Sequence, residues 1–346
     1  MKKHSGLNIH REMGPNVVAI GGGTGLSTML RGLKHYTENI TAIVTVADDG
    51  GGSGVLRQDL GMPPPGDIRN CLLALANTEP VMNELLGYRF DEGILKGQSF
   101  GNLFLAALNE ISPSFDVAVR RMSEVLAITG RVLPVTNANV NLEAEFENYT
   151  RVMGESKIFE CKKKQNCRIR KVRMVPERPQ ALAESVEAIR KADMILLGPG
   201  SLYTSIIPNL LVSGIVEEIC ASDALKLYIC NVMTQEGETE GYSAADHIQA
   251  IFTHADDHVF DYCLTNSATI PKEICERYAT EGAAPIICDH GACEKLGVQI
   301  IEKPVSLVEN DKVKHDPLAL GREIMGIYSE YGEIRIADDC CNQNEK

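Results

Sequence analysis

The chain has 346 residues, of which 44% are hydrophobic and 23% charged, so it can bury a large core and is not expected to be disordered. Its formal net charge is −13, which disfavours binding to nucleic acid or to an anionic membrane. No apolar run approaches the roughly 18 residues of a membrane span, and the polar start MKKHSGLNIHREMG lacks the apolar stretch of a signal peptide. We therefore expect a cytoplasmic protein without membrane insertion.

The first elements predict a β-α-β unit. Residues 1–15 are expected to form a flexible arm, and 16–20 (NVVAI) a buried strand that ends at the glycines of 21–25. A helix with a leucine-rich face follows, and then a second apolar strand at 41–47 (TAIVTVA). A right-handed crossover between the two strands implies a parallel sheet covered on both faces.

The middle of the chain changes its pattern. Helices are expected at about 68–77, 79–87, 100–111 and 114–127. Between about 130 and 176 the apolar residues alternate with a period of two, which predicts an antiparallel insertion. A basic run lies in this insertion, at Lys162, Lys163, Lys164, Arg168, Arg170, Lys171 and Arg173. It is interpreted as the solvated face of an edge hairpin, with contact to a partner protein as the alternative.

The pattern of a parallel sheet resumes after the insertion. A helix is expected at about 180–191, a strand at 193–197, a helix at 205–221 and a strand at 225–230. Further strands at 261–266 and 298–301 alternate with helices at about 243–254 and 316–329. The fold class predicted is α/β, a mainly parallel sheet with an antiparallel insertion, in one domain over 16–336 followed by a polar tail at 337–346.

Two glycine loops follow strands and are candidate phosphate sites. In the first, Gly22, Gly23, Thr24 and Gly25 would let backbone amides approach an anion at a helix start. Leu26 stands where a dinucleotide-binding fingerprint has its third glycine, and the lysine of a Walker A loop is absent. The loop sequence therefore does not identify the ligand. The second loop carries Gly198, Gly200 and Ser201, with Tyr203 and Thr204 behind it. A tight turn without a ligand is the structural alternative.

Other polar residues follow the strand ends or begin helices. Asp48 and Asp49 end the second strand, where one carboxylate would face the cleft and hold Mg²⁺, bind a ribose hydroxyl or act as a base on an acceptor hydroxyl; loop capping is the alternative. Asp67, Arg69 and Asn102 open two helices, as caps or as ligand contacts. Asn231, Thr234 and Gln235 follow a later strand, a lining that favours recognition over catalysis.

The eleven cysteines are expected to be reduced core thiols. Most lie in apolar segments, as Cys71, Cys220 and Cys230 do. Neither Cys161 with Cys167 nor the pair Cys340–Cys341 has zinc-site spacing, and a cytosolic setting disfavours disulfides. A metal or redox role is therefore not expected for them.

Ordered sequence blocks carry a family resemblance. GGGTGLSTMLRGLK, VTVADDGGGSG, PPGDIRNCLLALA, GNLFLAAL, GRVLPVT, GES, LLGPGSLYTSIIPNLL, CNVMTQEGETEGY and HDP resemble the CofD-like superfamily, and within it the YvcK-type gluconeogenesis factors. The resemblance runs from about 16 to about 330. It implies a Rossmann-like three-layer domain and cytoplasmic relatives that bind UDP-sugars such as UDP-N-acetylglucosamine and support cell shape and wall synthesis during gluconeogenic growth.

The same resemblance implies site residues and a second activity. It places the first glycine loop, Asp48, Asp49 and Asn231 in a shared cleft, and adds Tyr278 and Lys314 as contacts to the nucleotide sugar. Lysine at 314 stands where relatives tend to have arginine, which would weaken a bidentate phosphate contact. The enzymatic branch is similar to 2-phospho-L-lactate transferase, which uses Mg²⁺.

Two functions therefore remain. The favoured one is a nucleotide-sugar-binding regulator acting on partner proteins; the alternative is a Mg²⁺-dependent transferase with Asp48 or Asp49 as catalytic carboxylate and Asp49 as metal ligand. Which glycine loop holds the diphosphate stays open, as does the formation of a homo-oligomer.

Overall fold

The protein is built on a sheet of seven parallel strands. A computed structural model describes residues 14–165, 167–256 and 258–332. The strand order is β10-β9-β8-β7-β1-β2-β3. The strands are β1 (Val17–Gly21), β2 (Ile40–Val44), β3 (Arg131–Pro134), β7 (Met194–Leu197), β8 (Leu225–Ile229), β9 (Tyr262–Asn266) and β10 (Gln299–Lys303). Every residue of β1, β2, β7 and β8 is buried, as expected of strands covered on both faces.

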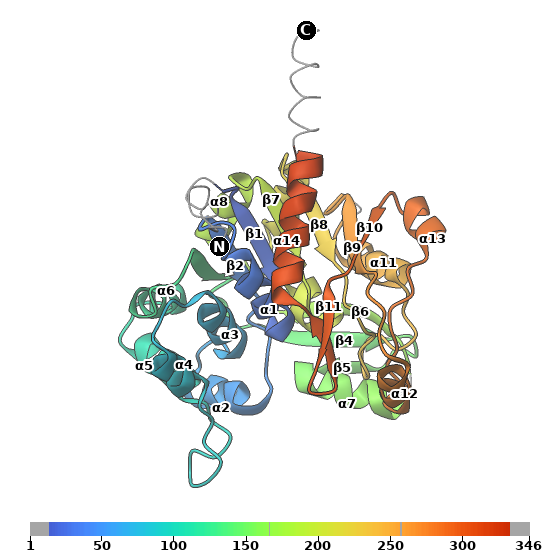
Figure 1. Cartoon of the computed structure of the whole chain (residues 1–346). Coiled ribbons are helices and arrows are strands. Elements are labelled where there is room, and N and C mark those ends of the chain that lie inside the picture. The colour runs from blue at the N-terminus through green and yellow to red at the C-terminus, as the bar shows by residue number, and fades with distance from the viewer. Residues whose placement is uncertain (1–13, 166, 257, 333–346) are drawn as a thin grey trace.

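Two layers of helices cover the sheet, which confirms the predicted α/β class. The first layer contains α1 (Gly23–Leu33), α3 (Gly66–Leu75), α6 (Phe115–Val125) and α14 (Pro317–Ile327). The second contains α8 (Ala183–Arg190), α9 (Ile207–Leu210), α10 (Ile215–Ala221) and α11 (Ala244–His254). In Figure 1, α14 lies beside α1; a Cβ on Gly32 of α1 would overlap the carbonyl oxygen of Pro317, so the two helices pack backbone to backbone.

The remaining helices flank these layers. They are α2 (Gly51–Leu60), α4 (Pro80–Gly87), α5 (Phe100–Glu110), α12 (Lys272–Thr280) and α13 (His290–Lys295), with π-helical turns η1 (Leu202–Ile206) and η2 (Tyr328–Gly332). None of the helices in the described ranges is long and apolar enough to cross a membrane. The expected arm and tail fall almost wholly on residues 1–13 and 333–346, outside the described residues.

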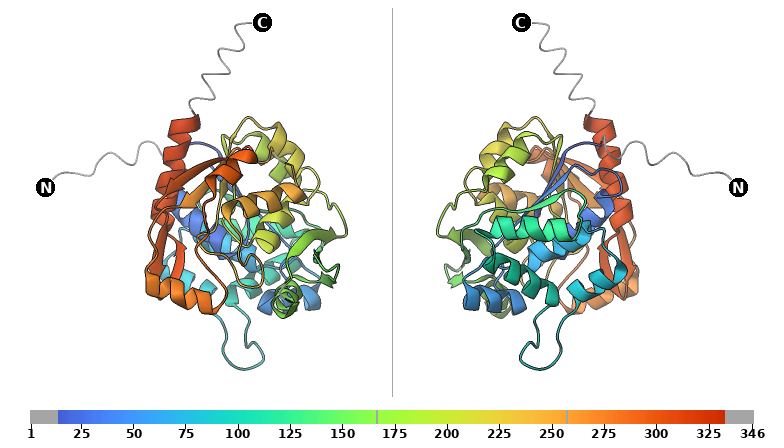
Figure 2. Two further views of the ribbon diagram at one scale, coloured as in Figure 1. Left: turned by 90° about the vertical axis from the view of Figure 1, so that its right-hand side faces the viewer. Right: turned by 90° about the vertical axis from the view of Figure 1, so that its left-hand side faces the viewer.

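The antiparallel insertion is shorter than predicted. Its sheet has the order β5-β4-β6, with β4 (Asn141–Phe146), β5 (Arg151–Met153) and β6 (Ile169–Val175). It lies on the side of the molecule away from α14 (Figure 2). Residues 131–134, predicted within it, instead form β3, which pairs in parallel with β2 at the edge of the main sheet. An edge strand is half exposed, so β3 alternates like an antiparallel strand.

The basic run does not form the single edge hairpin that we predicted. Its three lysines lie on a helix, α7 (Glu155–Gln165), and its other members lie in or next to β6. Lys162, 4% exposed, pairs with Glu240 at 2.9 Å, and Lys163 pairs with Glu236 at 2.8 Å. The predicted solvated face is present in part, because most of the basic residues are exposed, whereas Lys162 is buried with its carboxylate partner.

A hairpin that the sequence did not predict follows β10. Its strands are β11 (Ser306–Glu309) and β12 (Lys312–His315), which pair antiparallel. Asn310 and Asp311 form the turn with φ of 48° and 59°, the left-handed values of a type I′ turn. The hairpin brings β12 against α1, and with it Lys314.

Candidate functional site

The two glycine loops meet at the centre of the sheet. They follow β1 and β7, which are neighbours, and the chain leaves these strands in opposite directions along the sheet. A Cβ on Gly25 would lie 2.6 Å from the carbonyl oxygen of Pro199, and one on Gly200 would lie 3.2 Å from the carbonyl oxygen of Gly22. The loops therefore touch through their backbones. In open α/β sheets, ligands bind at this point where the strand order reverses.

A polar cleft of about 640 Å³ opens beside the loops. Its walls come from α1, the second loop, the end of β8 and the hairpin β11–β12. The predicted site residues that line it are Gly23, Thr24, Gly25, Gly200, Ser201, Asn231, Gln235 and Lys314. Ser205, whose hydroxyl the sequence also places behind the second loop, lines it too, and the lining residues that the sequence reasoning missed are Ser27, Thr28, Arg31, Asn70, Val232, Met233, Lys312, Val313 and His315. Three of the lining residues are cationic, Arg31, Lys312 and Lys314, in a chain that is otherwise acidic.

A buried glutamate occupies the helix start behind the second loop. The Glu238 carboxylate is 3% exposed and accepts hydrogen bonds from the backbone amides of Leu202, Tyr203 and Thr204 at 3.0 to 3.1 Å. Burial raises the pKa of Glu238 to about 7, against the opposing effect of these amides. These amides are thus satisfied within the protein and are not free for a diphosphate.

Side chains that were predicted to bind ligand hold the second loop in place. The Asn231 amide accepts from the Gly200 N–H at 3.2 Å and donates to the Gly200 carbonyl at 2.8 Å. The Ser201 hydroxyl donates to Gln235 Oε1 at 2.8 Å. The Tyr203 hydroxyl bonds to the hydroxyl of Tyr242 at 2.9 Å in the core. Tyr203 and Thr204, which the prediction put in the site, do not line the cleft.

Thr234 and Tyr278 also support the walls from behind. Thr234 N donates to the Ala284 carbonyl at 2.8 Å, and Ala284 N donates to the Thr234 hydroxyl at 2.9 Å. The Tyr278 hydroxyl accepts from the Val313 amide at 3.0 Å and so braces the hairpin that carries Lys314. Lys314 itself pairs with Glu309 at 3.2 Å.

The first loop leads into α1 without a side-chain cap at Gly22. A Cβ on Gly22 would meet Asp67 Oδ2 at 2.6 Å and Thr45 Cγ2 at 2.7 Å, so only glycine fits. The Gly23 amide, at φ of 68°, bonds to the Asp67 carboxylate. Asp67 therefore lies behind the first loop, and the following residues of α1 face the cleft.

Four carboxylates gather behind the first loop. Asp48 bonds to the Gly50 amide at 2.8 Å and shares a hydrogen bond with Glu155, the first residue of α7. Asp49, the predicted metal ligand, accepts from the Ser156 amide at 2.8 Å and so caps α7. Asp67 interacts electrostatically with Asp48. Neither aspartate lines the cleft, although one of them was expected to face it; both instead accept backbone hydrogen bonds, the role expected of the other.

Two members of this cluster hold protons more tightly than usual. Burial and then the charge of Asp48 raise the pKa of Asp67 to about 7. Burial and the charges of Asp48 and Asp67 raise the pKa of Glu155 to about 8. The nearby guanidinium of Arg69 opposes the shift of Asp67. The ionised carboxylates repel one another, and a bound cation would reduce this repulsion.

The carboxylate cluster predicts how stability depends on pH. Because the folded-state pKa values of Asp67 and Glu155 exceed their ordinary values, the stability that these groups contribute is lost as pH rises through about 5 to 8. Each shift corresponds to roughly 4–5 kcal/mol at most. Urea unfolding at a series of pH values, without divalent cations, should show this fall, and Asp67→Asn should flatten it. An unfolding free energy that climbs over this range would contradict the assignment.

Arg69 and Asn102 lie deeper than predicted. Arg69 bonds to the Ser99 hydroxyl and, at 2.7 Å, to the side chain of Asn70, which lines the cleft. Asn102, 2% exposed, bonds to the hydroxyl of Ser53 at 3.5 Å. Neither side chain lines the cleft, and both support residues around the carboxylate cluster.

His315 is a cleft residue that the sequence reasoning did not single out. It is 8% exposed, it bonds to the backbone of Cys230, and its Nε2 has no partner among the described residues. Burial lowers its pKa to about 4, so the ring is neutral at pH 7. The HDP block was the available signal, since it places a histidine beside Lys314.

The parallel sheet, its two helical layers and the polar cleft at the strand-order reversal define a Rossmann-like α/β protein. The chain belongs to the CofD family: the model of 2-phospho-L-lactate transferase CofD matches residues 17–306. A protein of Thermoanaerobacterium thermosulfurigenes, provisionally named a gluconeogenesis factor, is 54% identical over 327 residues, 94% of this chain and 99% of that protein. The gluconeogenesis factor of Bacillus subtilis (strain 168) is 50% identical over 303 residues, 87% of this chain and 94% of that protein.

A solved structure agrees with this assignment. The crystal structure of a UPF0052 family member from Bacillus halodurans matches with a TM-score of 0.86 and 47% identity, covering 90% of this chain and 99% of that chain. The Rossmann-like fold predicted from the family resemblance is thereby confirmed.

Proposed function

We propose that the protein binds a nucleotide sugar of the UDP-N-acetylglucosamine type in the cleft and acts as a regulator in gluconeogenic growth and cell-wall synthesis. The observation that carries the proposal is the polar cleft at the reversal point, which is lined by the start of α1 and by three cationic residues, Arg31, Lys312 and Lys314. A diphosphate between these cations and the amides of the first turn would be bound by charge from both sides. The cleft volume lies within the roughly 300–1,000 Å³ of small-molecule sites.

The first glycine loop is the better candidate for the diphosphate. Glu238 already takes three amides behind the second loop, whereas the first turn of α1 borders the cleft directly. The amides of Asn231 and Gln235 and the hydroxyl of Ser201 favour recognition of a sugar or base over bond cleavage. Names of the relatives support the link to gluconeogenesis. Cytoplasmic location and regulatory protein partners belong to the same proposal.

Binding should weaken when the cleft cations are removed. Lys312→Ala and Lys314→Ala should each lower the affinity for UDP-N-acetylglucosamine by about tenfold, because each would lose a charge-assisted contact to phosphate. Isothermal titration calorimetry measures this. Lys191→Ala is the matched control, since Lys191 pairs with Glu187 outside the cleft, and its affinity should equal that of the wild type. Equal affinities in the wild type and all three variants would rule out the cleft as the binding site.

A transferase is the second candidate, and the carboxylate cluster favours it. Oxygen ligands suit Mg²⁺. The raised pKa values of Asp67 and Glu155 indicate that the negative charge of the cluster is not balanced by cationic partners. No three acidic side chains of the cluster have their oxygens close enough together to bind one ion. Asp48 and Glu155 would therefore supply at most part of the coordination, and phosphate and water would complete it. The ion would offset charge that develops on a phosphoryl group.

Product analysis separates the two functions. The protein is incubated with UDP-N-acetylglucosamine and Mg²⁺, and nucleotides are resolved by chromatography. Unchanged ligand with measurable binding supports the regulator; release of UDP or UMP supports the transferase for this donor. If turnover occurs, Asp48→Asn should abolish it while sparing most of the affinity.

A further inference from the structure

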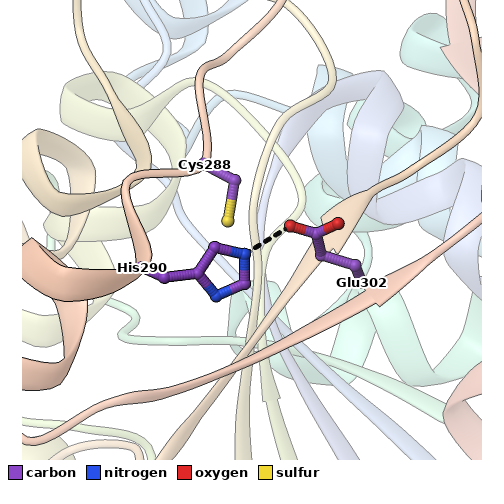
Figure 3. Close-up of side chains that lie close together, drawn as sticks. All are labelled: Cys288, His290 and Glu302. Atoms are coloured by element: carbon purple, nitrogen blue, oxygen red, sulfur yellow. Dashed lines mark hydrogen bonds and ion pairs between the residues drawn. The ribbon is translucent and has the colours of Figure 1, made fainter.

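We propose a second site in this protein, which binds one Zn²⁺ ion through Cys288, His290 and Glu302 and is separate from the cleft. Among the described residues, these are the only three metal-ligating side chains of His, Cys, Asp or Glu whose ligand atoms all lie within 4.8 Å of one another. Figure 3 shows the sulfur of Cys288 and the carboxylate of Glu302 both turned toward the imidazole of His290. Thiolate, imidazole and carboxylate are the three ligand types that zinc takes in proteins.

The spacing needs little adjustment to hold zinc. Ligand atoms around a tetrahedral zinc ion lie about 3.3–3.8 Å apart, given bond lengths of roughly 2.0–2.3 Å. The His290 Nε2 to Glu302 Oε1 distance is 2.6 Å, a hydrogen bond that would open by about 1 Å. Side-chain rotation suffices for this movement, since both residues are exposed.

The backbone around the site is held rigidly. Asp289, between the first two ligands, accepts hydrogen bonds from the Ala245 amide at 3.0 Å and from the Cys293 thiol at 3.7 Å. Glu302 lies on β10, which pairs in parallel with β9. The Thr265 hydroxyl of β9 donates to the Cys288 sulfur at 3.8 Å. Glu302 therefore lies on the main sheet, and the segment that carries Cys288 and His290 is fixed by its bonds to Ala245 and Thr265, as a metal site requires.

The ligand set selects the metal class. A sulfur and a nitrogen among three ligands disfavour Mg²⁺ and Ca²⁺, which take oxygen, and favour zinc. Burial raises the pKa of the Cys288 thiol to about 11, so metal binding would release that proton to solvent. With His290 and Glu302 exposed, the fourth coordination position faces water. The expected site is thus a three-ligand zinc site with one exchangeable water.

Cobalt spectroscopy tests the site directly. The full chain is stripped of metal with a chelator, dialysed, and titrated with Co²⁺, whose thiolate charge-transfer and tetrahedral absorption bands report sulfur ligation; Zn²⁺ is then added in competition. We expect one equivalent of Co²⁺ with a thiolate band, displaced by one equivalent of Zn²⁺. Absence of that band in the wild type overturns the proposal.

Variants assign the ligands. Cys288→Ala should remove the thiolate band, and His290→Ala and Glu302→Gln, which change exposed side chains, should weaken Zn²⁺ binding by about 100-fold each. Cys161→Ala is the matched control, because Cys161 is a half-buried thiol on α7 outside the proposed site, and it should bind as the wild type does. A band that survives Cys288→Ala, or Zn²⁺ affinity unchanged in both His290→Ala and Glu302→Gln, overturns the site. Circular dichroism verifies that each variant is folded.

Discussion

Glu238→Ala is expected to destabilise the protein by on the order of 3 kcal/mol at pH 7, with a fall in Tm of about 5 °C. The substitution leaves the buried amides of Leu202 and Tyr203, and the part-buried amide of Thr204, without an acceptor. The loss is partly offset because burial disfavours the carboxylate itself, as its pKa of about 7 indicates. Calorimetry or chemical unfolding measures the difference.

Two further variants make this result specific. Glu238→Gln keeps one acceptor oxygen but turns an amide group toward a donor, so it should lose about half as much stability. Glu187→Ala removes an exposed carboxylate whose partner is Lys191, and should cost less than about 1 kcal/mol. If Glu238→Ala lowered the free energy of unfolding no more than Glu187→Ala does, the Glu238 carboxylate would not be stabilising the helix start.

Gly25→Ala is expected to lower the affinity for the nucleotide sugar by at least about 100-fold. The new Cβ would stand 2.6 Å from the carbonyl oxygen of Pro199, so the two glycine loops must separate. A displacement of about 1 Å at a positioning loop can cost that factor. The same overlap should destabilise the fold by roughly 1–3 kcal/mol. Ligand titration and thermal unfolding check both.

Gly326→Ala is the matched control for this variant. Both glycines lie in helices, but a Cβ at Gly326 in α14 has no atom within 4 Å. Alanine there should raise stability by about 0.5–1 kcal/mol, through its better helix propensity, and leave binding unchanged. Wild-type affinity in Gly25→Ala would show that the loop contact does not shape the site.

The sequence predicted the centre of the molecule well, because local signals determine it. Continuous apolar runs at β1 and β7, each ended by glycines, mark buried parallel strands followed by helices. The strand at the edge of the main sheet and the helix in the insertion were harder to predict. The strand β3 alternates because one face is exposed, and α7 was missed because ESKIFECKKKQ is mostly polar and has only a weak apolar face.

The site could be predicted only in part, for a related reason. Residues on the loops themselves, such as Thr24 and Ser201, were found from their place after a strand. The role of Glu238 depends on amides more than 30 residues earlier, and nothing in its neighbourhood signals it. Cys288, in the loop before α13, meets Glu302 because its sulfur accepts from the Thr265 hydroxyl of β9, and Thr265 is the residue that Glu302 of β10 faces in the parallel pairing; no linear spacing reveals this.

One consequence concerns α7, whose two ends contact opposite parts of the site. At its start, the Asp49 carboxylate caps the helix by accepting from the Ser156 amide, and Glu155 bonds to Asp48. In its last turns, Lys162 and Lys163 pair with Glu240 and Glu236, on either side of Glu238. The helix is thus a strut between the acidic cluster and the segment that anchors the second loop. A substitution that shifts α7 is therefore expected to disturb the carboxylate cluster and the segment around Glu238 together.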